Sequence, residues 1–260
     1  MIKLMAAEKI IIDGQEIACL VSDSAQQVPL VFLHGAGSTR EVWHAQWLYF
    51  KDRTQVVIPD LPGHGDSPGK SHDTIDAYAD VVVKLAKKLG IGKCVLIGHS
   101  MGGAIAQRIA LLHPELLSGL VLVATGARLR VMPQVFSAIQ ADYGSYVELA
   151  SSVSLSPSAD EKTRSLFRKI LAQCAAQAAH DDFTACNRFD VMDMLPAIKT
   201  KTMIIAGDRD MMTPLKYARF LNQKIEASSL VIIGDAGHMV MMEKPDEVNT
   251  SVEKFAASIR

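Results

Sequence analysis

The chain has 260 residues, of which 49% are hydrophobic and 21% are charged, and this length and composition suit one large globular domain. Its formal net charge of −1 provides no global basic field, which argues against binding to nucleic acid or to an anionic membrane. No apolar run approaches the roughly 20 residues that a membrane helix requires. Charge interrupts the apolar N-terminal residues early, so we expect no secretion leader and a soluble, cytoplasmic protein.

The four cysteines are Cys19, Cys94, Cys174 and Cys186. Their wide spacing fits neither a disulfide framework nor a zinc site. We expect them to stay reduced, as is usual in a cytosolic protein. No cluster of residues has the spacing of metal ligands, so no metal site is predicted.

The predicted elements alternate between strands and helices along most of the chain. Two short strands joined at Asp13-Gly14 are expected within 8–21. The further strands are predicted at 28–33, 55–60, 95–97, 117–124, 201–206 and 229–233. The helices are predicted around Trp43 and Trp47, and at 73–89, 104–112, 214–224 and 245–258. Such alternation indicates a mainly parallel sheet with helices on both faces.

The alternation stops between about 129 and 198. This stretch contains helical pieces at 134–152 and 160–179 and no convincing strand. We interpret it as a helical cap inserted over one edge of the sheet, so that a single domain spans 1–260. The size of the cap favours small soluble esters over long-chain triglycerides as substrates, if the protein is an esterase.

The pentapeptide Gly98-His-Ser-Met-Gly102 lies between a predicted buried strand and an alanine-rich helix. A strand that turns directly into a helix bends sharply, and glycines on both sides let the backbones approach each other. The bend holds Ser100 in a strained conformation and exposes its side chain beside a helix N-terminus. Ser100 is therefore the candidate nucleophile.

Candidate partners for Ser100 follow two later strands. A serine hydroxyl attacks well only when a neighbouring base removes its proton, and His238 follows the last predicted strand. The base needs a carboxylate that fixes its tautomer, and both Asp208 and Asp210 follow the preceding strand. The carboxyl ends of parallel strands are where ligands bind in such sheets, so either aspartate could complete the site.

Five motifs together make the chain resemble the α/β-hydrolase fold superfamily over nearly its whole length. They are HGAG at 34–37, DLPGHGDS at 60–67, GHSMGG at 98–103, GDRDMMTP at 207–214 and GHMVMMEKP at 237–245. The order Ser, Asp, His is also that of the superfamily. The resemblance implies the α/β-hydrolase fold, with a mainly parallel eight-stranded sheet, helices on both faces and a helical cap insertion.

The resemblance also implies roles for single residues. The family spacing G-x-x-D-x-x-x-P favours Asp210 over Asp208 as the acid. The oxyanion would be bound by the backbone N–H groups of Ala36 and Met101. Structural rather than catalytic roles are expected for the other histidines near the motifs, namely His34, His64 and His99.

For five methionines and for Arg188, a structural role is the simpler expectation. The methionines beside the predicted acid and base are expected to be mostly core, with one or two lining an acyl pocket; they are Met211, Met212, Met239, Met241 and Met242. Arg188 could meet a substrate carboxylate, but a solvated or salt-bridged arginine is the simpler expectation.

The function implied by the resemblance is that of a serine carboxylesterase acting on short- to medium-chain esters. Ser100 would attack the carbonyl with His238 as base, and water activated by His238 would hydrolyse the acyl-enzyme without a cofactor. Serine at the elbow argues against haloalkane dehalogenases and epoxide hydrolases, which have aspartate there. The expected partner is a small-molecule ester, and the oligomeric state stays open.

Several alternatives share the fold. The enzymatic ones are an enol-lactonase, a C–C bond hydrolase, a cofactor-free perhydrolase and a thioesterase. The C–C hydrolases usually have H-G-x-G-P-G, and the stretch 34–39 lacks that proline-glycine pair. A C–C bond hydrolase is therefore a less favoured alternative. The alternative from another class is a ligand-binding receptor that uses the fold without rapid turnover.

Overall fold

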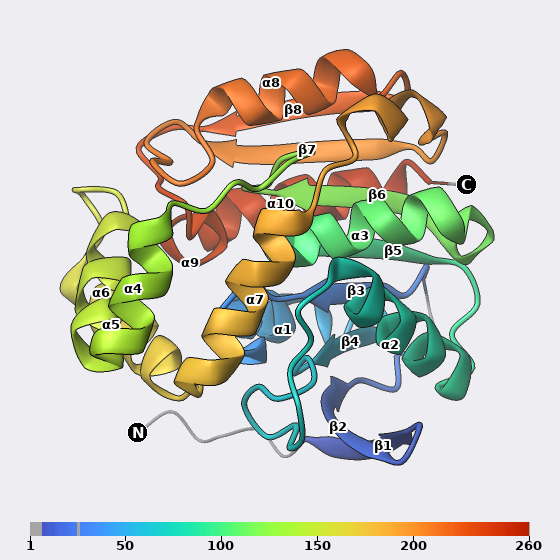
Figure 1. The fold of residues 1–260 in the computed structure, drawn as a ribbon. Helices are drawn as coiled ribbons and strands as arrows, with labels where there is room; N and C mark the ends of the chain where they lie inside the picture. Colours follow the sequence, from blue (N-terminus) through green and yellow to red (C-terminus); the bar gives the residue numbers. More distant parts are fainter. Residues whose placement is uncertain (1–6, 25–26, 260) are drawn as a thin grey trace.

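A single sheet of eight strands forms the centre of the computed structural model, which describes residues 7–24 and 27–259. The first six residues, part of the segment in which no leader is expected, lie outside the described residues. The strand order is β1-β2-β4-β3-β5-β6-β7-β8 (Figure 1). The strands are β1 (Glu8–Ile12), β2 (Gln15–Val21), β3 (Leu30–Leu33), β4 (Val56–Pro59), β5 (Cys94–His99), β6 (Leu117–Val123), β7 (Thr202–Gly207) and β8 (Ser228–Ile233).

Only the first two strands run against the others. β1 pairs antiparallel with β2 and β2 with β4, while every other neighbouring pair is parallel. Asp13 and Gly14 form the turn between β1 and β2, and both have positive φ angles, of 50° and 79°. The predicted eight-stranded, mainly parallel sheet is therefore confirmed, including its N-terminal hairpin.

Helices cover both faces of the sheet. Successive residues of a strand point to opposite faces: Val95 and Ile97 of β5 belong to the hydrophobic core that α1 and α10 cover, whereas Leu96 belongs to the core that α2, α3 and α8 cover. These helices are α1 (His44–Phe50), α2 (Ile75–Lys88), α3 (Met101–Leu112), α8 (Leu215–Lys224) and α10 (Pro245–Ala257). The short helices are η1 (Arg40–Trp43), η2 (Pro114–Leu116), η3 (Met192–Ala197) and α9 (Val240–Glu243). Trp43 and Trp47 are both buried.

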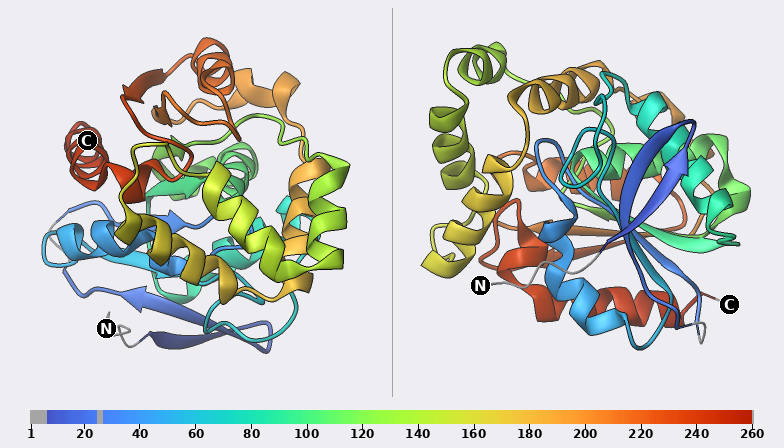
Figure 2. Two further views of the ribbon diagram at one scale, coloured as in Figure 1. Left: turned by 90° about the vertical axis from the view of Figure 1, so that its left-hand side faces the viewer. Right: turned by 90° about the horizontal axis from the view of Figure 1, so that it is seen from below.

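Four helices, called the cap helices below, lie between β6 and β7 in the chain: α4 (Pro133–Ala141), α5 (Tyr143–Val153), α6 (Glu161–Ala172) and α7 (Ala176–Arg188). They stand beside the ends of the sheet to which the parallel strands point (Figures 1 and 2). The only bridge within the predicted strandless stretch is an isolated pair between Arg128 and Asp190. The cap helices are thus placed over the edge where ligands bind in such sheets.

The two long helical pieces predicted at 134–152 and 160–179 are each wrong in one respect. The first is broken at Asp142, whose backbone is extended and whose side chain accepts a hydrogen bond from the N–H of Gly144 to cap α5. The second stops at Ala172, and a new helix runs from Ala176 to Arg188. The alanine-rich sequence across this second break contains neither glycine nor proline, so periodicity did not reveal it.

One property bears on the surroundings of the protein. No helix within 7–24 and 27–259 combines the length and the apolar character needed to cross a lipid bilayer.

Candidate active site

Ser100 occupies the sharp turn between β5 and α3. Its φ of 51° and ψ of −113° lie where residues with a side chain are rarely found. A Cβ atom on Gly98 would collide with the carbonyl of Gly102, and one on Gly102 would collide with the carbonyl of Leu33. The two glycines flanking Ser100 therefore permit the turn, and the Ser100 side chain is partly exposed at its tip.

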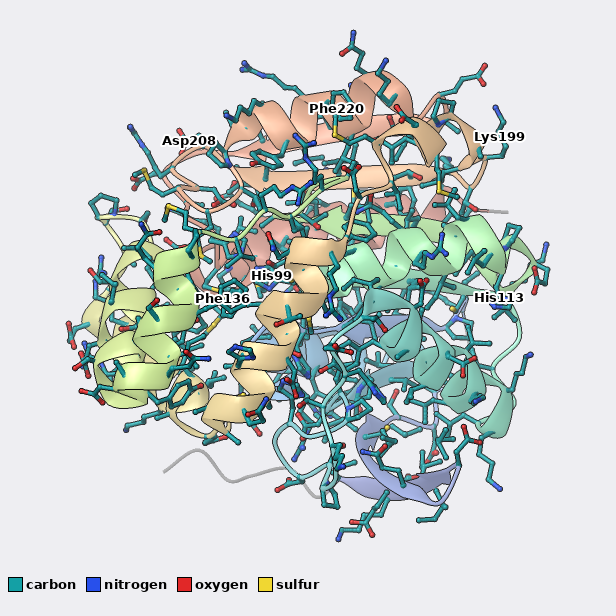
Figure 3. All side chains as sticks on the ribbon, in the orientation of Figure 1. His99, His113, Phe136, Lys199, Asp208 and Phe220 are labelled. Carbon is teal, nitrogen blue, oxygen red and sulfur yellow. The ribbon has the colours of Figure 1, made fainter. Side chains whose placement is uncertain are left out.

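Asp210 and His238 meet across the loops that follow β7 and β8. His238 Nδ1 donates to Asp210 Oδ2 at 2.9 Å, and both side chains are buried. Three more donors hold the Asp210 carboxylate: the backbone N–H groups of Met212 and Thr213, each 2.8 Å from Oδ1, and the Thr213 hydroxyl, 2.7 Å from Oδ2. Asp208, by contrast, makes no hydrogen bond to His238, and its nearest cation is its neighbour Arg209 at 3.8 Å (Figure 3).

These contacts keep the Asp210 carboxyl ionised. Burial alone would raise its pKa, because removal from water disfavours the charged form. The charge of His238 and the hydrogen bonds from His238 and Thr213 outweigh that effect and hold the pKa of Asp210 below its ordinary value. An ionised carboxylate at Nδ1 is the group that fixes the proton on that nitrogen and leaves Nε2 free to accept one.

Two further histidines border the site and are neutral. Burial and the neighbouring charge of His238 lower the pKa of His99 well below its ordinary value; this buried residue is labelled in Figure 3. Burial and the charge of His64 lower the pKa of His34 to about 3. His99 Nε2 donates to the carbonyl of His238 at 3.1 Å, and His34 Nε2 accepts from the N–H of Leu61 at 3.0 Å. Both side chains thus hold loops together without adding charge beside His238.

Ser100 and His238 line the same two adjoining pockets. No hydrogen bond joins their side chains in this structure. Catalytic hydrogen bonds are often long in unliganded enzymes and shorten in the complex with substrate. The structure thus joins Asp210 to His238 directly and brings Ser100 to the same pockets as His238.

The backbone N–H groups of Ala36 and Met101 are the two predicted oxyanion donors. Ala36 lines both pockets, and Met101 is the first residue of α3. Neither N–H donates a hydrogen bond to any acceptor among residues 7–24 and 27–259, whereas the next N–H along the loop, that of Gly37, is bonded to Asp182. Free donors at a helix N-terminus and in a facing loop are suited to bind a negatively charged oxygen.

Asp182, in the cap helix α7, is a buried residue that the sequence did not reveal. Its Oδ2 accepts from Gly37 N and from His64 Nε2, both at 2.8 Å, and its Oδ1 accepts from the Tyr78 hydroxyl at 2.5 Å. Burial alone would lower the pKa of His64, but the Asp182 carboxylate outweighs it and raises that pKa well above its ordinary value. A fully buried ion pair therefore connects the cap to the loop that carries His64, and the same carboxylate binds the N–H of Gly37, which follows Ala36.

Replacing Asp182 by asparagine is expected to lower stability and turnover together. An amide oxygen in the place of Oδ2 can still accept from Gly37 and His64, but it carries no charge, so the change leaves protonated His64 buried without its counter-charge; breaking such a pair costs about 3 kcal/mol of unfolding free energy. A neutral amide oxygen accepts from the Gly37 N–H more weakly than a carboxylate does, which loosens the loop that carries the Ala36 N–H, and we expect kcat to fall on the order of tenfold. Urea unfolding and steady-state kinetics measure the two effects.

Two controls separate these effects. Asp181→Asn changes the adjacent carboxylate, which contacts Ser71 and Gln177, and should alter neither quantity much. Tyr78→Phe removes one hydrogen bond to Asp182 but keeps the Gly37 contact, so it should lower stability with little change in kcat. A variant Asp182→Asn with normal kcat would show that Asp182 has no influence on the loop.

The cap also contacts the loop that carries His238. The N–H groups of His238 and Met239 both donate to the carbonyl of Ser154, at 2.8 and 3.2 Å. Glu243 accepts from the N–H of Gly237 at 3.0 Å and from the N–H of Ser156 at 2.9 Å, which ties the same loop to the cap a second time. The position of His238 thus depends on residues more than 80 positions away in the sequence.

The remaining residues singled out in the sequence fall in different places. Arg188 forms an ion pair with Asp73 at 2.5 Å, in keeping with the simpler expectation. Met239 and Met212 line the pockets at Ser100, while Met241 is buried elsewhere in the core and Met211 is exposed. All four cysteines are free and buried. In the part of the chain that the structure describes, no group of three or more His, Cys, Asp or Glu side chains is arranged to hold a metal ion.

Comparisons with known proteins identify the family of the chain. A family model described as the alpha/beta hydrolase family matches residues 30–251. The chain is 27% identical over 253 residues to a pimeloyl-[acyl-carrier protein] methyl ester esterase of Neisseria meningitidis, covering 92% of this chain and 77% of that protein. A solved thermophilic esterase is 33% identical, with a TM-score of 0.85 and 97% coverage of both chains. A thermophilic esterase from Thermogutta terrifontis is 28% identical, with a TM-score of 0.87 and coverage of 97% and 99%.

Proposed function

The chain belongs to the alpha/beta hydrolase family, and we propose that it is a serine carboxylesterase that cleaves small esters through an acyl-enzyme on Ser100. The observation that carries the proposal is the hydrogen bond from His238 Nδ1 to the ionised Asp210, which leaves Nε2 available in the pockets that Ser100 lines. The esterases among the relatives and structural neighbours support the same reaction class.

The proposed reaction has two halves. In the first, Ser100 Oγ attacks the ester carbonyl while its proton passes to His238 Nε2, and Asp210 stabilises the resulting imidazolium. The N–H groups of Ala36 and Met101 bind the negative oxygen of the tetrahedral intermediate, and His238 then returns the proton to the leaving alcohol. In the second, water gives its proton to His238 and attacks the acyl-enzyme, which releases the acid and restores Ser100.

The size of the acyl group is limited by the pocket between Ser100 and the cap, here called the inner pocket. Its walls are mostly apolar side chains from the cap helices and the His238 loop: Tyr146, Ala150, Phe167, Leu171, Phe183 and Met239. Aromatic and aliphatic walls favour an apolar acyl chain. Because these walls close over the site, we propose short to medium acyl chains as the preferred ones.

The test is a set of initial rates on p-nitrophenyl esters from acetate to palmitate, with parallel labelling by a serine-directed phosphonate. We expect an optimum at short or medium chains, and loss of turnover when a single phosphonate is attached to Ser100, as located by peptide mass spectrometry. Labelling of Ser100 without turnover of any ester, lactone or thioester would instead favour the receptor alternative. A label on another residue would reject the proposed nucleophile.

A further inference from the structure

Two further pockets lie beside the inner pocket, and each shares lining residues with the pocket next to it. The first, the middle pocket, is lined by Ser100 and His238 and also by Arg130 and Tyr217. The second, the outer pocket, is lined by Arg130 and Tyr217 again. Because the same two side chains border both, the two pockets adjoin at Arg130 and Tyr217.

Three cations line the outer pocket, Arg128, Arg130 and Lys216, and none of its lining residues is acidic. Arg128 is paired with Asp190 at 3.6 Å. Arg130 and Lys216 form no ion pair with any residue of 7–24 and 27–259, and the one hydrogen bond from the Arg130 guanidinium, to the carbonyl of Asn187, is long at 3.4 Å. Most of the guanidinium donors of Arg130 are therefore available to a ligand.

This concentration of positive charge is local. The whole chain has a formal net charge of −1, so the outer pocket is not one part of a generally basic surface. A pocket lined by charge of a single sign attracts an oppositely charged ligand, and low-dielectric walls strengthen the effect. The other walls are apolar or aromatic: Ala127, Met192, Tyr217 and Phe220, the last of which belongs to α8 (Figure 3). These walls suit a ligand with an apolar or aromatic body and an anionic end.

We propose that the outer pocket binds an anionic group, a carboxylate or a phosphate, on the leaving half of the ester, with Arg130 as its main contact. This inference rests on the proposed esterase function. The apolar inner pocket, which contains Gly35 and Ala36 of the oxyanion loop, accepts the acyl half, and the leaving half then points along the middle pocket towards Arg130. The planar guanidinium pairs with two oxygens at once, a geometry that both carboxylate and phosphate offer.

The experiment compares three acetyl esters that share one ring: neutral 4-acetoxybenzamide, 4-acetoxybenzoate and 4-acetoxyphenyl phosphate. For each, kcat/KM is measured in the natural protein and in Arg130→Gln. Because each ratio compares one ester in two proteins, the intrinsic reactivity of the ester cancels. We expect Arg130→Gln to lower kcat/KM for one or both anionic esters about tenfold more than for the neutral ester, the effect of losing a charged hydrogen bond at a partly hydrated site. The ester with the larger effect identifies the anion.

Two matched variants sharpen the result. Arg130→Lys keeps the charge without the planar fork and should recover only part of the preference. Arg219→Gln removes the same charge from an exposed position on α8 that lines neither pocket, and should leave the preference unchanged. Added salt should weaken the preference in the natural protein, since the site is open to solvent.

Other outcomes would overturn the inference. If Arg130→Gln and Arg219→Gln lowered kcat/KM for the anionic esters equally, the effect would come from the overall electrostatic potential of the protein and not from a site at Arg130. An Arg130-dependent preference found only with monoesters of dicarboxylic acids would reverse the assigned orientation. Binding of 4-hydroxybenzoate and 4-hydroxybenzamide, followed by ligand-observed NMR, needs no turnover: equal binding of the two rejects the anion site, whereas an Arg130-dependent difference without ester turnover rejects the esterase proposal alone.

Discussion

Replacing Ser100 by alanine is expected to abolish ester turnover while the protein stays folded. The hydroxyl is the only group at the elbow that the proposed mechanism uses as a nucleophile, and loss of the serine in such an enzyme lowers kcat on the order of 10⁶-fold. The fold should tolerate the change, because the Ser100 hydroxyl donates no hydrogen bond to a described residue and alanine adds no atom to the tight turn. Steady-state rates on the best ester and the thermal midpoint measure the two expectations.

The control for this experiment is Ser38→Ala. Ser38 also lines the inner pocket, and its buried hydroxyl has no hydrogen-bond partner among the described residues. Its removal tests whether any pocket hydroxyl matters, and we expect a far smaller loss of kcat than for Ser100. A Ser100→Ala protein that keeps even a few per cent of the turnover of the natural protein would exclude Ser100 as the nucleophile.

Local sequence patterns were enough to predict the sheet and its order of elements. The apolar strands differ from the amphipathic helices in period, and each boundary is marked within a few residues by a turn such as Asp13-Gly14. The elbow is also a local feature, since the strain at Ser100 is accommodated by glycines two positions away on either side. For these parts of the molecule, the pattern that identifies each element lies within a few consecutive residues.

Long-range contacts set the limit of the prediction. Asp182 lies 145 positions from Gly37 and 118 from His64, so no spacing in the sequence connects them. The helix predicted at 160–179 ends before Asp182, and no sequence motif includes this residue. The sequence did not single out Arg130 for the same reason. Arg130 and Ser100 are related only because both line the middle pocket. Asp182 and Arg130 both belong to the cap stretch at about 129–198, and the sequence did not predict the two helix breaks in that stretch either.

The two aspartates after β7 differ in the local turn that holds them, and this difference supports the choice of Asp210 as the proposed acid. The spacing from Gly207 to Pro214 favoured Asp210. In the structure, the backbone of this turn folds back so that the N–H groups of Met212 and Thr213 both point at Asp210 Oδ1. Those two hydrogen bonds fix the direction of the carboxylate and leave its other oxygen for His238. Asp208 lies outside this turn and is partly exposed.

Asp210→Asn is expected to lower kcat about 10⁴-fold, by analogy with triad enzymes in which the tautomer of the histidine is reversed. Because two N–H groups point at Oδ1, the amide oxygen must occupy that position, and the amide nitrogen then faces His238 Nδ1. That nitrogen donates a hydrogen bond and drives the histidine proton to Nε2, where it blocks acceptance of the Ser100 proton. Asp208→Asn removes the same charge without a contact to His238, so its kcat should stay within about twofold of the natural protein. Kinetics of both variants on one ester decide the matter, since a greater loss in Asp208→Asn would transfer the role of the acid to Asp208.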